Sequence, residues 1–219
     1  MRQRFLPPAL AVLGILGLCA ITSTAHASPV PARDAAAASG GATVNVPYIS
    51  RTRIDGEWVP IENYTRDFTV TAPASVKPGK EFTVRFDSAP ILAVGDFNKT
   101  LTDLRVAYRV SGQGTVAKYK LEGGSNTGDA RFRVERHGAD LVVRSDDSFP
   151  GGVEFDIPDL VVTVRATGSG TVTTSPGGSS FDDPAFYWFR EQTTSGSWDP
   201  FQNYVDPAHP VTFTSTTVG

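Results

Sequence analysis

The chain has 219 residues, 40% of them hydrophobic and 20% charged, and a formal net charge of −3. A mildly acidic chain lacks the basic surface that binding to nucleic acid or anionic lipid needs, so neither is an expected partner. Its single cysteine, Cys19, excludes an internal disulfide and a thiolate zinc site, so a hydrophobic core must stabilise the fold.

Residues 1–27 are predicted to be a secretory signal peptide. Two arginines precede an almost wholly apolar run at 10–21, which is too short to span a bilayer comfortably. Small side chains at Ala25 and Ala27 then provide the cleavage site that a signal peptidase accepts. We therefore expect a secreted, extracellular protein with no membrane insertion after cleavage; a retained anchor is the weaker alternative. Cleavage removes the cysteine and leaves 18 basic against 23 acidic residues, a formal charge of −5.

The mature chain divides into a linker and one domain. Residues 28–43 are mostly Ala, Pro, Gly and Ser, a composition typical of a flexible linker. A single β-sandwich domain is predicted over 44–219. It begins with a hairpin at 48–61, because the Asp-Gly pair at 55–56 separates two β-type runs and both turn positions need a positive φ. Pro60 indicates that this hairpin lies at a sheet edge.

Strand patterns recur through the rest of the chain. Apolar and polar residues alternate with a period of two, or β-branched residues cluster, at 68–70, 82–86, 104–110, 132–134, 153–157, 161–164 and 211–213. Turn-forming residues separate these runs at 77–80, 123–126, 137–140, 150–152 and 175–178. No helical period persists for three turns. Many short strands with Gly- and Pro-rich turns predict an all-β sandwich.

Two stretches carry a resemblance to a known class of domains. The segment 72–84 reads A-P-A-S-V-K-P-G-K-E-F-T-V, which resembles the opening strands of bacterial immunoglobulin-like domains, and the segment 152–166 adds to the likeness. Over roughly residues 67–218 the chain is similar to secreted actinobacterial immunoglobulin-like proteins of mostly unassigned function. The resemblance implies an immunoglobulin-like antiparallel β-sandwich with an extra N-terminal hairpin. It supplies no functional residues.

Catalytic and metal-binding signatures are missing from the sequence. His137 and His209 are the only histidines after the predicted cleavage site, and neither Gly-x-Ser-x-Gly nor His-Glu-x-x-His occurs. We therefore expect no enzyme activity, no metal site and no cofactor. Loop acids leave two weaker alternatives: a calcium site, and a hydrolase acting through carboxylates such as Asp182 and Asp183.

The aromatic cluster near the C-terminus is the most informative feature for binding. If 186–189 is a strand, Phe186 and Trp188 point one way and Tyr187 and Phe189 the other. Further aromatic residues follow in the polar, turn-rich stretch 198–204.

One face of this cluster is needed for the core, and the other is available for a ligand. The candidate ligand-binding residues are Tyr187, Trp198 and Tyr204, with core packing as the alternative for each. The predicted function is a secreted, non-enzymatic binding module for an envelope or extracellular partner, either a cell-wall polysaccharide or a protein. A structural or adhesive protein that self-associates is the second hypothesis.

Overall fold

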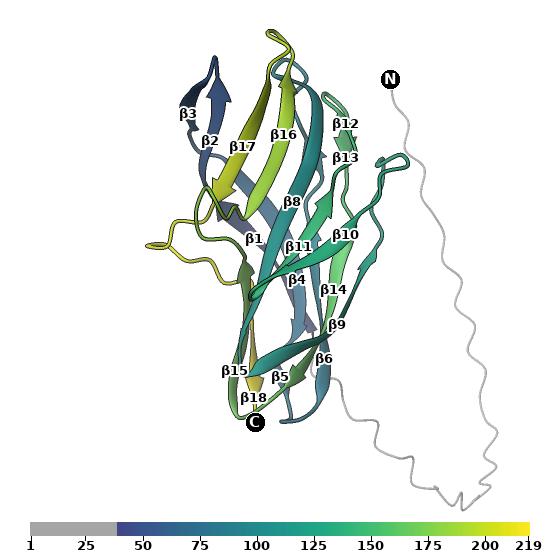
Figure 1. Cartoon of the computed structure of the whole chain (residues 1–219). Helices are drawn as coiled ribbons and strands as arrows, with labels where there is room; N and C mark the ends of the chain where they lie inside the picture. Colours follow the sequence, from purple (N-terminus) through teal and green to yellow (C-terminus); the bar gives the residue numbers. More distant parts are fainter. Residues whose placement is uncertain (1–38) are drawn as a thin grey trace, which may run out of the picture. The chain divides into compact units, whose positions relative to one another are not determined.

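The computed structural model describes residues 39–219, and all regular structure in this range is β-strand (Figure 1). The predicted signal peptide at 1–27 and most of the predicted linker at 28–43 lie outside the described residues. Among the described residues, no helix has the length and hydrophobicity needed to cross a membrane.

Two sheets form the layers of a sandwich. The smaller contains, in spatial order, β1 (Ser39–Pro47), β4 (Thr65–Pro73), β6 (Glu81–Ser88), β14 (Asp159–Ala166) and β9 (Gly114–Glu122). The main path of the larger sheet contains β3 (Glu57–Ile61), β2 (Ile49–Ile54), β17 (Trp198–Tyr204), β16 (Phe186–Gln192), β8 (Asn98–Gly112), β15 (Gly170–Pro176), β18 (Thr214–Val218) and β5 (Ser75–Val76).

The larger sheet branches at β8, its longest strand. One edge of β8 pairs with β16 and β15, and the other pairs with β11 (Asp140–Ser145) and β12 (Phe149–Pro150). Strand β10 (Arg133–His137) pairs with β11 in turn. A separate two-stranded sheet joins β7 (Ile91–Leu92) to β13 (Glu154–Phe155).

The core lies between the two layers and is built from alternate residues of each. Phe68 and Phe86 of the smaller sheet and Tyr108 of the larger sheet are almost fully buried. The ring centroids of Phe86 and Tyr108 are 4.7 Å apart, and those of Phe68 and Tyr108 are 6.0 Å apart. Aromatic pairs at such separations contribute about 0.5–1.5 kcal/mol beyond their buried area.

The chain is therefore an all-β, immunoglobulin-like antiparallel sandwich with an extra N-terminal hairpin, as predicted. Only one strand pair in the described part is parallel: β18 and β5 near the C-terminal end. The predicted hairpin is formed by β2 and β3, and its turn has Asp55 at φ 53° and Gly56 at φ 85°. Two positive φ values are typical of a type I′ turn. Strand β3, which contains Pro60, is the terminal strand of the larger sheet, so the edge position is confirmed.

Three sequence predictions about local structure are wrong. Residues 39–43, predicted as the end of the linker, belong to β1, which pairs with β4 along its whole length. Residues 211–213, predicted as a strand, precede β18, which begins at Thr214. At 39–43, pairing with β4 decides the structure, and composition alone does not report that pairing. At 211–213, the Phe213 N–H donates to the Thr174 carbonyl oxygen at 2.8 Å, but regular pairing with β15 begins only at Thr214.

The stretch 198–204, expected to be turn-rich, is strand β17. Its alternate residues Asp199, Phe201 and Asn203 are buried. A polar side chain is tolerated inside a sheet when it is hydrogen-bonded, and the Asn203 amide donates to the Phe186 carbonyl oxygen at 3.0 Å.

Candidate functional site

Strands β16, β17 and β2 are neighbours in the larger sheet, and alternate residues project from its outer surface. Within β16, Phe186 and Trp188 are buried in the core, whereas Tyr187 and Phe189 are half-buried on the outer surface. The alternation predicted for this aromatic run is thus present. The outer surface of these strands is accessible to a partner, whereas the opposite surface packs into the sandwich.

Strand pairing brings the three candidate residues onto this one surface. Tyr187 lies opposite Gln202, and Trp198 lies opposite Glu191 at the other end of the pairing. Tyr204 follows Gln202 by two residues and therefore faces the same way. Whether these residues bind a ligand stays a prediction.

Trp198 is the most exposed of the three candidates. Its side chain is 42% exposed, and its ring stacks on Phe189 with the centroids 5.6 Å apart and the planes at 29°. The contact fixes the ring on the surface while leaving much of it accessible. A tryptophan held in this way presents a rigid apolar area with little conformational entropy left to lose on binding.

Arg51 of β2 lies between two aromatic rings. Its guanidinium carbon is 3.8 Å from the centroid of Trp58 and 3.9 Å from that of Phe181. Its Nε donates a hydrogen bond to Oε1 of Gln202 at 2.8 Å. Phe181 also makes an edge-to-face contact with Tyr204 at 4.8 Å. The guanidinium is therefore fixed by two cation–π contacts and one hydrogen bond.

Tyr187 pairs with a second arginine. The Arg105 guanidinium carbon is 4.8 Å from the Tyr187 ring centroid, and Arg105 Nε donates to Asp103 Oδ1 at 2.9 Å. Partial burial raises the pKa of the Tyr187 hydroxyl above its usual value, with the nearby Asp103 carboxylate adding to the effect. The phenol therefore remains a neutral hydrogen-bonding group at physiological pH.

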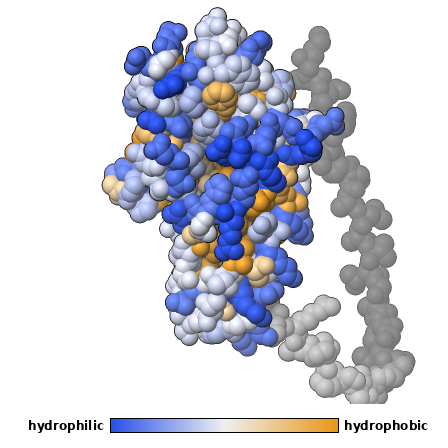
Figure 2. Space-filling model, viewed as in Figure 1, coloured by the Kyte–Doolittle hydropathy of each residue, from blue (hydrophilic) through white to orange (hydrophobic). Residues whose placement is uncertain are grey.

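We call these outer-surface residues the aromatic–arginine face; its members are Arg51, Trp58, Arg105, Phe181, Tyr187, Phe189, Trp198 and Tyr204. Beside it, β10 and β11 carry ion pairs between Arg144 and Asp103 at 3.1 Å and between Arg133 and Asp146 at 2.8 Å. In the middle of the surface seen in Figure 2, where Figure 1 places β10 and β11, a strongly hydrophilic band accordingly runs beside hydrophobic patches. Charged and aromatic areas thus adjoin on this side of the sheet.

The acids and histidines considered for catalysis are separate from one another. His209 Nδ1 lies 2.9 Å from Asp206 Oδ2 in one loop, whereas His137 Nε2 lies 3.4 Å from Glu135 Oε2 in β10. Asp183 Oδ2 accepts a hydrogen bond from the Ser179 hydroxyl at 2.8 Å, so its carboxylate takes part in a local turn. Over residues 39–219, no three His, Cys, Asp or Glu side chains are grouped as a metal site would require.

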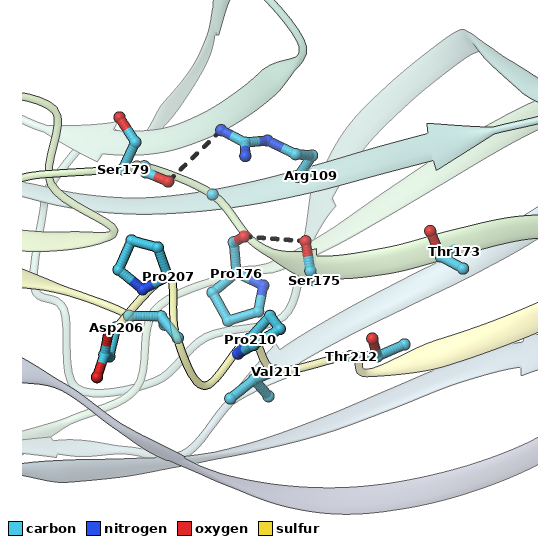
Figure 3. Close-up of a pocket in the computed structure, with 13 residues that line it drawn as sticks. Arg109, Thr173, Ser175, Pro176, Ser179, Asp206, Pro207, Pro210, Val211 and Thr212 are labelled. Atoms are coloured by element: carbon cyan, nitrogen blue, oxygen red, sulfur yellow. Dashed lines mark hydrogen bonds between the residues drawn. The ribbon is translucent and has the colours of Figure 1, made fainter.

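A polar pocket of about 290 Å³ lies between β15 and the loop that leads from β17 to β18 (Figure 3). Arg109 lies at its wall, and one of its nitrogens points to the backbone of the adjacent loop. That guanidinium already forms a two-pronged ion pair with Asp140, at 2.5 and 2.8 Å. Because its charge is neutralised within the protein, this pocket offers an anion little attraction.

Sequence reasoning missed Arg51, Arg105 and Phe181. A weak signal exists for Arg51, since it alternates with Arg53 in the predicted hairpin that also carries Trp58. No local pattern marks Phe181, which lies in the loop before β16 and meets Arg51 only in the folded chain.

The fold and this surface define a class, a β-sandwich module with a structured aromatic and cationic surface. A comparison with protein-family models and with curated proteins gave no match. Solved structures with a similar arrangement include a protein from Corynebacterium diphtheriae described as membrane-anchored, which is 16% identical with a TM-score of 0.48. The match covers 82% of this chain and 38% of that one, so this chain spans well under half of that protein's length.

Two cohesins show a weaker similarity. One is the cohesin module of a family 33 glycoside hydrolase from Clostridium perfringens, at 8% identity and a TM-score of 0.37, covering 80% of this chain and 98% of the module. The other is a non-cellulosomal cohesin from the archaeon Archaeoglobus fulgidus, at 12% identity and a TM-score of 0.29, covering 68% and 91%. Similarities this distant carry no argument about function, so the proposal below rests on the surface itself.

Proposed function

We propose that this protein is a secreted, non-enzymatic binding module whose aromatic–arginine face binds an extracellular protein. The observation that carries the proposal is the pair of rigid anchors on one surface. Arg51 is held between Trp58 and Phe181, and the exposed ring of Trp198 is fixed by Phe189. Secretion rests on the signal peptide predicted over 1–27.

The composition of the face favours a protein partner over a polysaccharide. Tryptophan, tyrosine and arginine are the residue types that dominate the energetics of protein–protein interfaces. Several of these rings already use one side for an internal contact: Trp58 lies on Arg51, and Tyr187 lies on Arg105. Those occupied ring faces are not available to stack on sugars, whereas ring edges and guanidinium groups remain suited to a protein surface.

The face is large enough to form the centre of a standard interface. From Trp198 to Tyr204 the β17 strand spans six residue steps, or about 20 Å at ~3.3 Å per residue. Strands β16 and β2 extend the surface sideways on both sides of β17. With β3 and β8 the face covers five strands, or roughly 480 Å² at about 4.8 Å per strand. A stable protein–protein interface uses about 800 Å² on each partner, so the interface is expected to extend from the face onto the neighbouring β11 and β10.

The test is retention of the purified protein on intact cell envelopes of the producing organism, with and without prior protease treatment of the envelopes. We expect saturable retention that protease treatment abolishes and that Trp198→Ala weakens by about tenfold or more, the loss expected for an interface anchor. Tyr119→Ala is the matched control, because Tyr119 is an exposed aromatic residue on β9 of the other sheet.

Each other outcome counts against the proposal. Retention that survives protease treatment would indicate a polysaccharide ligand. No retention, or equal loss in the Trp198→Ala and Tyr119→Ala variants, would contradict the assignment of this face. A stable dimer that Trp198→Ala dissociates would instead support the self-associating alternative.

A further inference from the structure

The inner surface of β16 and β17 lines a second, apolar pocket at one end of the sandwich. The hairpins β2–β3 and β16–β17 project at that end beyond β1 and β6 (Figure 1). Their inner surface is covered there by the segment between β7 and β8. A pocket of about 350 Å³ lies between these two walls. Its lining residues are mainly apolar and include Ile54, Trp188 and Phe201 on the sheet wall and Leu92, Val94 and Phe97 on the other.

The mouth of this pocket is unusually hydrophobic for a protein surface. Leu92, Val94 and Phe97 are all exposed, Phe97 to 65%, and Ile54 is exposed across from them. These four side chains are among the nine large exposed hydrophobic residues of the described part of the chain. Apolar side chains gathered around an opening mark a binding site more often than chance exposure does.

A buried arginine forms part of the pocket wall. Arg190 is only 8% exposed, and all of its hydrogen bonds go to neutral acceptors. Its Nε donates to the Thr52 hydroxyl at 3.2 Å, and its Nη1 donates to the Phe97 carbonyl at 3.2 Å and to Asn98 Oδ1 at 3.3 Å. Burial lowers the pKa of Arg190, and Asp199 opposes this effect from a distance.

Across residues 39–219, no carboxylate lies within the 4.0 Å of an ion pair with Arg190. Asp199 faces it across the strand pair, but the Asp199 carboxylate accepts its hydrogen bonds from Gln192 and Ser197 instead, each at 2.7 Å. Arg66 is a second buried arginine without an ion pair in this range, but it does not line the pocket. Arg190 therefore brings to the pocket a charge that no neighbouring carboxylate neutralises at close range.

We propose that this pocket binds a medium-chain fatty acid, with the alkyl chain among the apolar side chains and the carboxylate on Arg190. The apolar walls select a hydrocarbon body, because moving each methylene out of water contributes about 0.8 kcal/mol. The guanidinium carries the charge that a carboxylate needs, and its Nη2, which makes none of the hydrogen bonds described above, is the nitrogen that donates to it. A buried cation is costly until it is paired. A volume of about 350 Å³ lies near the lower end of ligand pockets, about 300–1,000 Å³, which suits a small ligand.

This site is independent of the proposed function. Trp188 and Arg190 point from β16 toward the inside of the sandwich, whereas Tyr187 and Phe189 of the same strand point outward. Trp198→Ala is therefore expected to leave fatty-acid binding unchanged. The two proposals can fail separately.

The experiment is isothermal titration calorimetry of the purified protein with decanoate, and with decan-1-ol as the uncharged ligand of the same chain length. We expect saturable decanoate binding and at least tenfold weaker binding of decan-1-ol. Arg190→Gln keeps a hydrogen-bonding side chain but removes the charge, so it is expected to reduce the affinity for decanoate to that for decan-1-ol. Circular dichroism checks that the variant is folded.

If Arg190→Gln fails to fold, a pair of variants at Leu92 tests the proposal instead. Leu92 is exposed at the mouth, so Leu92→Asp and Leu92→Asn are both expected to fold. Leu92→Asp should weaken decanoate binding at least threefold more than Leu92→Asn, because only Asp repels the carboxylate. The proposal is overturned if decanoate does not bind saturably below the concentration at which it self-associates. It is also overturned if decan-1-ol binds as tightly as decanoate, or if Leu92→Asp and Leu92→Asn behave alike.

Discussion

The arginines on the two surfaces of the β16–β17 pair differ in their burial and in their partners. On the outer surface, Arg51 and Arg105 are fixed by aromatic rings and by polar or acidic partners. On the inner surface, Arg190 is buried in an apolar wall and contacts only neutral acceptors. An arginine at a wet surface can be positioned at little cost, whereas a buried one has given up its hydration. The difference teaches that one strand pair can hold a fixed aromatic and cationic surface on one side and a buried arginine beside an apolar pocket on the other. The two proposals rest on these two features.

The largest expected effect separates the two tryptophans of these strands. Trp188 is 6% exposed and packs on Phe186 and Phe201, with ring centroids 5.1 and 4.9 Å away. Trp188→Ala should lower the free energy of unfolding by about 3–5 kcal/mol, because it leaves a cavity in the core. Trp198→Ala should change it by less than about 1 kcal/mol, as is usual for exposed positions. Urea unfolding of both variants measures the difference, and equal losses would contradict the assignment of inner and outer surfaces.

An intermediate effect is expected for the arginine held between two rings. Arg51→Ala removes both cation–π contacts and the hydrogen bond to Gln202, and should lower the free energy of unfolding by about 1–2 kcal/mol. Arg51→Lys keeps the charge but loses the planar stacking, so it should recover only part of the loss. Arg53→Ala is the control, because Arg53 is exposed and its guanidinium carbon is 4.9 Å from the Trp58 ring centroid, farther than that of Arg51. A stability of Arg51→Ala equal to that of Arg53→Ala would show that the stacking contributes nothing.

The smallest expected effect on stability comes from two carboxylates, Asp87 and Asp146, whose pKa values are shifted in opposite directions by folding. The pKa of Asp87 on β6 is raised, first by burial and then by the nearby carboxylates of Asp159 and Asp156. The pKa of Asp146 is lowered, chiefly by a hydrogen bond from Arg133. An acid whose pKa is raised on folding destabilises the native state, and the effect is complete at pH values above the raised, folded-state pKa. An acid whose pKa is lowered on folding stabilises the native state, and the effect is complete at pH values above the unfolded-state pKa.

At pH 7, Asp87→Asn should therefore raise the free energy of unfolding and Asp146→Asn should lower it. The gain in Asp87→Asn should shrink as the pH falls through the raised pKa toward the ordinary value of 3.8, where wild-type Asp87 becomes protonated. The loss in Asp146→Asn should shrink below 3.8, as the pH falls through the lowered pKa. Urea unfolding of both variants and the wild type at pH 7 and pH 3.5 gives the comparison. Changes of the same sign at pH 7 would refute it.

Much of the architecture could be predicted because a half-buried strand has a local sequence pattern, the alternation of apolar and polar residues. Alternation indicated the strands around 82–86 and 104–110, and the Asp-Gly turn at 55–56 fixed the hairpin that became β2–β3. Strand β17 could not be predicted, because buried Asp199 and Asn203 look like turn residues until their hydrogen-bond partners are known. The acceptor for Asn203 is 17 residues away, on β16.

The candidate surface was predicted in part. Tyr187, Trp198 and Tyr204 do lie on one side of the sheet, but the sequence could not show that Arg51 joins them. Arg51 meets Gln202, 151 positions away, only through the pairing of β2 with β17. Contacts of that kind depend on the order of strands in the sheet, which no local pattern encodes.

The sequence by itself determined the β-class, the edge hairpin and the division of the 186–189 run into two faces, because side-chain direction alternates with a period of two along any strand. Which of the two faces packs into the core was decided by the tertiary structure. Only the tertiary structure decided where strands of the larger sheet extend beyond the smaller sheet. At that end, Leu92, Val94 and Phe97 form one wall of a pocket, and Arg190 lies in the opposite wall. The physical reason is that burial depends on which distant segment covers a strand, and this is set by the lengths and pairing of whole sheets.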